Sequence, residues 1–61
     1  MPTVTVDALE GRTIEQKRGL AKDITAAVVK NFNVTQNVVI IYIRELKKEN
    51  FAKDGKLSID S

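Results

Sequence analysis

The 61-residue sequence contains no cysteine and no histidine. Without thiols no disulfide can form, and without thiolate or imidazole ligands the usual structural zinc sites are excluded. The carboxylates are scattered, with no spacing typical of a metal site. Nucleophilic catalysis by a Ser-His or Cys-His pair is excluded for the same reason. We therefore expect neither a metal nor a cofactor.

Aromatic residues are scarce, at 5% of the chain, and no hydrophobic run is long enough to span a bilayer. No signal-peptide pattern stands at the N-terminus, so we expect a cytoplasmic protein without membrane contacts. The net charge is +2, but acidic residues are interspersed with basic ones along the whole chain. Few rings are present to stack on bases, so we expect no nucleic-acid partner.

The length predicts a single domain, residues 1–61, that is marginal on its own. A chain of this size buries only about 60% of the surface that its unfolded form exposes. Small domains are usually stabilised by disulfides, by a structural metal or by oligomerisation. Since the composition excludes the first two, we expect self-association.

Two segments of the chain are typical of strands. Residues 3–8 alternate polar and apolar side chains, which predicts a strand with one buried face. Residues 38–43 form an unbroken apolar run, which predicts a strand buried on both faces. A single helix covers only one face of a two-stranded sheet, so another copy of the chain is the expected cover for the second face.

Residues 14–32 carry apolar side chains at helical spacing, which predicts an amphipathic helix. Thr13 and Gln16 form a capping-box pattern at its start. Asn31 and Asn33 are suitable residues for its end, because asparagine tolerates the left-handed conformation. Lys17 is the exception in the pattern, because it projects toward the apolar side, where its stem could pass the edge of the core or meet a neighbouring subunit.

Strand, helix and strand together predict a βαβ unit with a right-handed crossover and parallel strands. The polar segment after the second strand contains Gly55, which suits the tight turn of a short hairpin. We therefore predict an α+β fold: one βαβ unit with a C-terminal hairpin, assembled as an oligomer.

The only proline, Pro2, follows the initiator methionine. As a strand residue it loses nothing by lacking an N–H. Once Met1 is removed, however, it is a secondary amine that can accept a proton. Taken alone, Arg12 is most simply a solvated surface residue and Phe51 an anchor for the polar tail. Glu45 and Glu49 lack a partner that would suggest an acid–base role, and both are interpreted as surface charge.

These residues together resemble a known family. Pro2 after a methionine, a short alternating strand and then LEGRTIEQK (residues 9–17) opening a helix resemble the 4-oxalocrotonate tautomerase family. The later part agrees, with REL at 44–46, KENF at 48–51 and GK at 55–56. The resemblance covers nearly the whole chain without evident insertions.

The resemblance implies a cofactor-independent tautomerase that moves a proton in an enol or dienol of a 2-oxo acid. Pro2, freed of Met1, matches the family's general base. Arg12 matches the arginine that holds a substrate carboxylate from an adjacent subunit, a task that suits an always-charged, bidentate guanidinium. Leu9 matches a position whose backbone lies beside the substrate, and Phe51 matches an aromatic that lines the pocket. The family also implies a homohexamer built as a trimer of dimers.

One position departs from the family pattern. A second arginine, which polarises the substrate carbonyl in the best-studied subgroup, is matched here by Ile40. Arg44 lies on the same face but roughly 13 Å away at ~3.3 Å per residue, too far to replace it. The resemblance therefore implies poor turnover of dicarboxylates such as 2-hydroxymuconate, and better turnover of a monoacid enol. The alternative hypothesis is a non-catalytic oligomeric binding module on the same scaffold.

Overall fold

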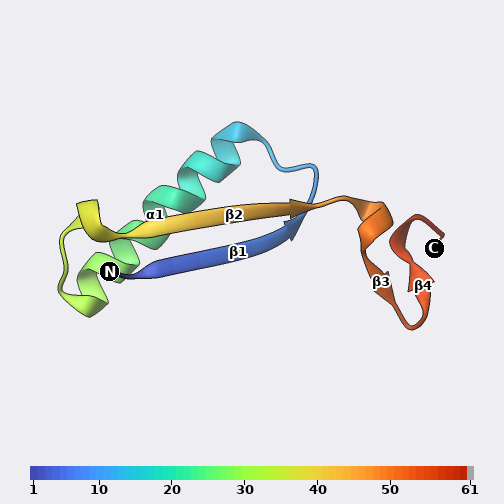
Figure 1. The fold of residues 1–61 in the computed structure, drawn as a ribbon. Helices are drawn as coiled ribbons and strands as arrows, with labels where there is room; N and C mark the ends of the chain where they lie inside the picture. Colours follow the sequence, from blue (N-terminus) through green and yellow to red (C-terminus); the bar gives the residue numbers. More distant parts are fainter. Residues whose placement is uncertain (61) are drawn as a thin grey trace.

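The computed structural model describes residues 1–60, which form two parallel strands, one helix and a terminal hairpin (Figure 1). The elements are β1 (Thr3–Leu9), α1 (Ile14–Phe32), β2 (Ile40–Leu46), β3 (Ala52–Lys53) and β4 (Lys56–Leu57). β1 pairs with β2 in parallel, and β3 pairs with β4 in antiparallel fashion. The α+β arrangement expected from the sequence, a βαβ unit with a C-terminal hairpin, is confirmed.

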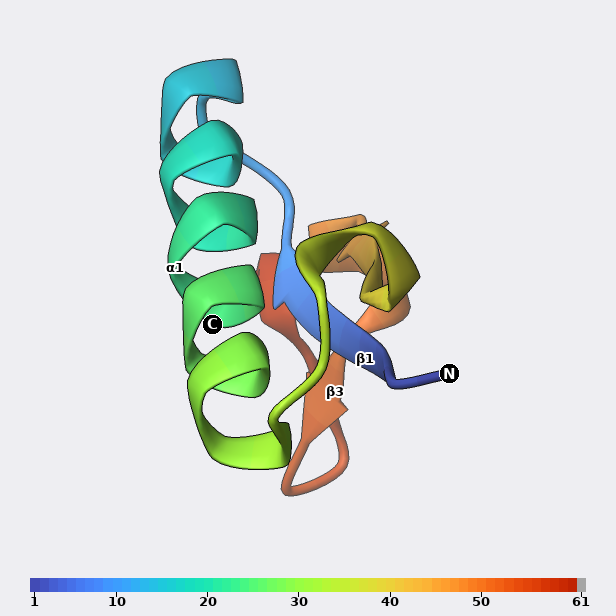
Figure 2. The same ribbon diagram turned by 90° about the vertical axis from the view of Figure 1, so that its left-hand side faces the viewer.

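The two long strands run from the pair Thr3 and Ile40 at one end to the pair Leu9 and Leu46 at the other. Side chains of β1 alternate between exposed and half-buried along its whole length, as the period-two pattern predicted. The half-buried ones face α1, which lies on one side of the sheet in Figure 2. The opposite face is open, and Tyr42 on that face is 57% exposed.

β2 begins two residues later than the apolar run of the sequence predicted. The run starts at Val38, whereas the strand starts at Ile40. Gln36–Val38 forms a 3₁₀ turn that connects the helix to the strand. The reason is the register: the N–H of Ile40 donates to the Pro2 carbonyl at 3.0 Å, so β1 offers almost no backbone for earlier residues to pair with.

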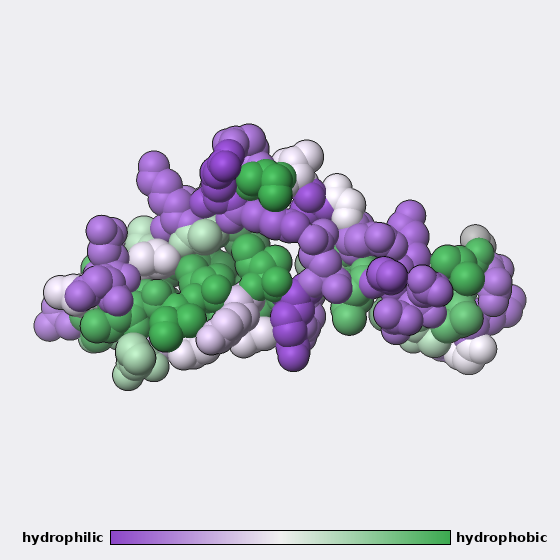
Figure 3. Space-filling model, turned by 45° about the horizontal axis from the view of Figure 1, so that its top comes forward, coloured by the Kyte–Doolittle hydropathy of each residue, from purple (hydrophilic) through white to green (hydrophobic). Residues whose placement is uncertain are grey.

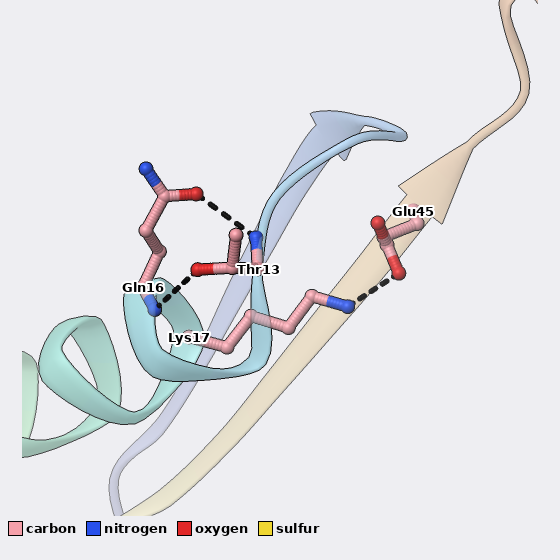
Figure 4. Close-up of polar contacts among 4 residues, drawn as sticks. All are labelled: Thr13, Gln16, Lys17 and Glu45. Atoms are coloured by element: carbon pink, nitrogen blue, oxygen red, sulfur yellow. Dashed lines mark hydrogen bonds and ion pairs between the residues drawn. The ribbon is translucent and has the colours of Figure 1, made fainter.

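α1 begins at a complete capping box, as predicted. The N–H of Gln16 donates to Thr13 Oγ1 at 3.0 Å, and the N–H of Thr13 donates to Gln16 Oε1 at 2.9 Å (Figure 4). The helix ends at Asn33, which adopts a left-handed φ of 56° and donates its N–H to the Val29 carbonyl. Of the two asparagines proposed for this end, Asn33 is the cap, and Asn31 still belongs to the last helical turn.

The hairpin turn consists of Asp54 and Gly55, with φ values of 53° and 80°. Positive φ at both central residues is the geometry of a type I′ turn, whose twist matches that of two antiparallel strands. The turn predicted around Gly55 is therefore confirmed. The hairpin lies beyond the C-terminal ends of β1 and β2 and extends away from them in Figure 1.

No residue in the described part of the chain is fully buried. The radius of gyration is 14.9 Å, and the chain measures 44 × 23 × 13 Å. A compact chain of this length has a radius of gyration of only about 10.5 Å. Apolar surface is visible over the βαβ unit and again over the hairpin in Figure 3. Within residues 1–60, no helix combines the length and hydropathy needed to cross a membrane.

Candidate functional site

A hollow with a volume of about 260 Å³ lies between the first turns of α1 and the C-terminal halves of β1 and β2. Its apolar lining comes from Val6, Ala8, Leu20 and Ile43. Its polar lining comes from Arg12, Gln16, Lys17 and Glu45. The hollow is the place where the loop before the helix, the helix and both strands meet.

An ion pair crosses this hollow from the helix to the sheet. Lys17 Nζ lies 2.5 Å from Glu45 Oε1, with the two side chains 26% and 35% exposed (Figure 4). The hydrogen bond from Lys17 holds the pKa of Glu45 below its usual value, with a smaller contribution from the Gly11 N–H. The structure shows the first of the two positions considered for Lys17. Its stem passes the apolar edge of the hollow, and its ammonium group binds Glu45 of β2.

Glu45 is exposed, as its interpretation as a surface charge implies, but it is paired with Lys17, a contact that was not predicted from the sequence. Its register partner Ala8 lies on the face of the sheet that α1 covers. The sequence does contain the signal for this pair. Period two places Glu45 on the same face as Ile43, and Lys17 is the one charged residue that projects to the apolar side of the helix. Each of these two charged residues breaks the apolar pattern of its surface, and the two surfaces face each other, so their pairing could have been predicted.

Arg12 lies in the loop between β1 and α1, directly before the helix cap. None of the ion pairs found within residues 1–60 includes it. Glu10, two residues before Arg12, anchors the start of the loop, because its N–H donates to the Leu46 carbonyl at 2.9 Å. Glu10 Oε2 in turn accepts the N–H of Lys48 at 3.0 Å. Arg12 thus lines the hollow from an anchored loop and is exposed there. Leu9, the last residue of β1, lies three residues before Arg12 in the sequence and is 38% exposed.

Pro2 lies at the other end of the same strand. It is half-buried, and Met1 before it is 85% exposed. The carbonyl of Pro2 accepts the Ile40 N–H, which ties it to the start of β2. Seven residues of extended strand separate Pro2 from Leu9, or about 23 Å at ~3.3 Å per residue. One chain therefore does not bring Pro2 together with Leu9 and Arg12.

Phe51 lies in a third place, between the 3₁₀ turn Lys48–Asn50 and β3. Its carbonyl accepts the Ser58 N–H at 2.7 Å, so it belongs to the hairpin. It is 40% exposed and lines a second hollow of about 430 Å³ together with hairpin residues such as Leu57. Phe51 does not line the hollow that contains Arg12.

Arg44 is paired with Asp7 on the open face of the sheet. Its Nε and Nη2 donate to the two carboxylate oxygens of Asp7 at 2.7 and 3.0 Å, a bidentate pair. This pair holds the pKa of Asp7 below its usual value. Arg44 shares its face of β2 with Ile40, as the alternation predicted, but its guanidinium is committed to Asp7. Within the described residues no cluster of three potential metal ligands is present.

With this geometry in view, the sequence matches the family described as "Tautomerase enzyme" over residues 2–60. The chain belongs to the tautomerase family. It is 43% identical over 56 residues to the 2-hydroxymuconate tautomerase of Bacillus subtilis, which covers 92% of this chain and 90% of that protein. The resemblance noted from the LEGRTIEQK block and the enzyme class that it implied are thereby confirmed.

Solved structures of the tautomerase family have the same fold as this tautomerase chain. YwhB, a homologue of 4-oxalocrotonate tautomerase, matches it with a TM-score of 0.91 and 40% identity over 98% of both chains. A heterohexameric 4-oxalocrotonate tautomerase from Chloroflexus aurantiacus matches with a TM-score of 0.88 and 30% identity, over 98% of this chain and 97% of that one. The tautomerase fold expected from the resemblance is confirmed.

Proposed function

We propose that the chain is a cofactor-independent tautomerase that moves a proton in an enol or dienol of a 2-oxo acid. Pro2 is the general base once Met1 has been removed, and Arg12 holds the substrate carboxylate. The observation that carries this proposal is Arg12, which is exposed at the lining of a partly apolar hollow and has no ion-pair partner within residues 1–60. An unpaired arginine in such a place favours a carboxylate ligand.

The surroundings of Pro2 suit a base. Residues 2–6 contain no ionisable side chain, and within 34–43 only Tyr42 is ionisable. An apolar environment favours the neutral form of an amine, which is the form that accepts a proton. The hydrogen bond between the Pro2 carbonyl and Ile40 also fixes where the amine lies. These features support the role of Pro2 in proton transfer.

The proposal requires several copies of the chain. Pro2, Arg12 and Phe51 lie in three separate places, and no residue among 1–60 is fully buried. A homohexamer arranged as a trimer of dimers would allow Leu9, Arg12 and Phe51 of neighbouring copies to surround Pro2. The Chloroflexus aurantiacus neighbour is a heterohexamer, which supports this assembly size. Sedimentation that shows a stable folded monomer at micromolar concentration would contradict it.

We propose a monocarboxylate enol as the substrate class. Ile40 stands where the resemblance implies a second arginine, and Arg44 is held by Asp7. Only one carboxylate clamp, Arg12, then remains. Phenylenolpyruvate, which has a single carboxylate, is therefore expected to be turned over better than the dicarboxylate 2-hydroxymuconate.

The decisive experiment compares two preparations of the same chain. Intact mass identifies protein with and without Met1, and ultraviolet absorbance follows ketonisation of phenylenolpyruvate. We expect turnover only without Met1, because an acylated Pro2 is an amide with no basic nitrogen. Pro2→Ala keeps a primary amine, so activity should fall without vanishing and the ascending limb of the pH profile should move. Full activity with Met1 retained would refute Pro2 as the base.

One observation favours a second candidate, a non-catalytic oligomeric binding module. Ile40 removes the second arginine implied by the resemblance, which is the kind of change that accompanies loss of an activity. Retention of Met1 on protein isolated from its native host would favour the binding module. Turnover by the trimmed protein would exclude it.

A further inference from the structure

We propose that Lys17 prevents Glu45 from pairing with Arg12, and so keeps the Arg12 guanidinium free for a substrate carboxylate. The inference rests on the proposed role of Arg12 as the carboxylate clamp. Lys17 and Glu45 are positioning residues in this account, because they act through Arg12 and need not touch the substrate themselves.

The first step of the argument is the charge balance of the hollow. Two cations, Arg12 and Lys17, line it together with a single carboxylate, Glu45. Glu45 is bound by Lys17 at 2.5 Å, and none of the ion pairs within residues 1–60 includes Arg12. The remaining polar group, the side chain of Gln16, accepts the N–H of Thr13 in the capping box. The hollow therefore holds one paired cation and one unpaired cation.

The second carboxylate near Arg12 is held elsewhere too. Glu10 precedes Arg12 by two residues, and its Oε2 accepts the backbone N–H of Lys48 at 3.0 Å. Its own N–H is bound to the Leu46 carbonyl. Both carboxylates that border Arg12 thus have other donors, and this arrangement leaves Arg12 as the open anion-binding group.

The third step concerns what happens without Lys17. A carboxylate that has lost its cation gains most from a bidentate arginine. Arg12 is the other cation that lines the same hollow. In the absence of Lys17, Glu45 would therefore bind Arg12 and compete with the substrate carboxylate.

The pair on the outer face of α1 provides a matched control. Arg18 and Glu15 form an ion pair whose side chains are 69% and 79% exposed, outside the hollow. Water and salt screen such a pair strongly, and it contributes little to stability. Changing it tests for general effects of removing a helix charge without touching Arg12.

The test is a double-mutant cycle on the assembled, Met1-free protein. Lys17→Met should raise KM for phenylenolpyruvate roughly ten-fold or more, the value of one charge-assisted contact, and change kcat less. The double variant Lys17→Met with Glu45→Gln should return KM close to that of the unmodified protein. Arg18→Met should leave KM unchanged. If the pair only attached helix to sheet, the double variant would be as impaired as the single one, and that result would overturn the inference.

A binding measurement separates this inference from the proposed function. Cinnamate, a monocarboxylate that cannot ketonise, is titrated calorimetrically into each variant. Binding that weakens in Lys17→Met and recovers in the double variant supports the inference even if no enol is turned over. Binding that is unchanged in Lys17→Met overturns it even if the enzyme is fully active.

A further variant covers the case in which Lys17→Met does not fold. Glu45→Gln alone keeps both cations and removes only the competing carboxylate. It should bind cinnamate at least as tightly as the unmodified protein, whereas weaker binding would contradict the inference. Lys17→Arg retains the cation and should behave like the unmodified protein in both assays.

Discussion

The two ends of the β1–β2 sheet differ sharply in polarity. At the N-terminal end of the strands, Pro2 and Ile40 are joined by a backbone hydrogen bond, and ionisable side chains are absent from residues 2–6. At the C-terminal end, charged groups are dense, and the Lys17–Glu45 pair and the Arg12 loop meet there. The proposed base Pro2 lies before the start of β1, and the proposed carboxylate clamp Arg12 lies in the loop after its end.

The distance between these two ends explains why one chain alone cannot form the proposed site. The sheet keeps its apolar end and its charged end about 23 Å apart, at ~3.3 Å per residue over seven residues. A substrate of a few carbon atoms cannot bridge that distance. The proposed site therefore needs a neighbouring copy, placed so that its charged end meets the uncharged end of the first.

The largest effect is expected from mixing an inactive chain with an impaired one. One chain carries an N-terminal extension that converts Pro2 to an amide, and the other carries Arg12→Ala. Joint unfolding and refolding should restore activity well above that of either chain alone, because some sites then combine a free Pro2 with an intact Arg12. Ketonisation of phenylenolpyruvate measures the recovery.

The matched control places both changes in one chain and mixes it with the extended chain. No site can then combine the two intact groups, so no activity should return. If the first mixture also gains no activity although mixed oligomers form, Pro2 and Arg12 do not serve the same site from different copies.

A smaller effect is expected from Arg12→Ala alone. Loss of one charge-assisted contact is worth about 1.5–3 kcal/mol, or roughly one to two orders of magnitude in kcat/KM for a carboxylate substrate. Arg18→Ala, on the outer face of α1, is the control and should keep full activity. Sedimentation should show the same oligomer for both variants. An Arg12→Ala enzyme with unchanged kcat/KM would remove the charged end of the sheet from the mechanism.

The smallest effect concerns stability in acid. The pKa of Asp7 and that of Glu45 are lowered in the folded chain from ordinary values of 3.8 and 4.5, by Arg44 and Lys17 respectively. Their contribution to stability is therefore complete above about pH 4.5 and is lost as the pH falls through the lowered values. Thermal unfolding should show a shallower loss of Tm below pH 4.5 for Asp7→Asn with Glu45→Gln than for the unmodified chain. An equal loss of Tm with pH in both proteins would show that Asp7 and Glu45 do not cause the loss of stability in acid.

Local signals made much of the fold predictable. The capping box of Thr13 and Gln16, the left-handed Asn33 and the turn at Gly55 each depend on a few neighbouring residues. Such patterns can be recognised in a sequence because the interacting residues lie within three or four positions of one another. The alternation of β1 was equally clear, since one face of the strand is covered and the other is not.

Features that depend on pairing between distant segments were not predictable in the same way. The start of β2 at Ile40 and the contact between Lys17 and Glu45 both follow from the register of the two strands and the position of α1 over them. Local sequence patterns do not specify that register, although the two charged exceptions Lys17 and Glu45 were a signal for their own contact. The roles of Pro2 and Phe51 stay predictions, because they depend on copies of the chain that meet only in an assembly.

The neighbouring residues Arg44 and Glu45 have a consequence for how the strands align. They point to opposite faces of β2, where Arg44 binds Asp7 of β1 and Glu45 binds Lys17 of α1. A slip of one residue would place Asp7 opposite either Ile43 or Glu45, so that a bidentate pair is replaced by an apolar neighbour or by like charges. Because no residue among 1–60 is fully buried, the Asp7–Arg44 pair helps to select the correct strand register.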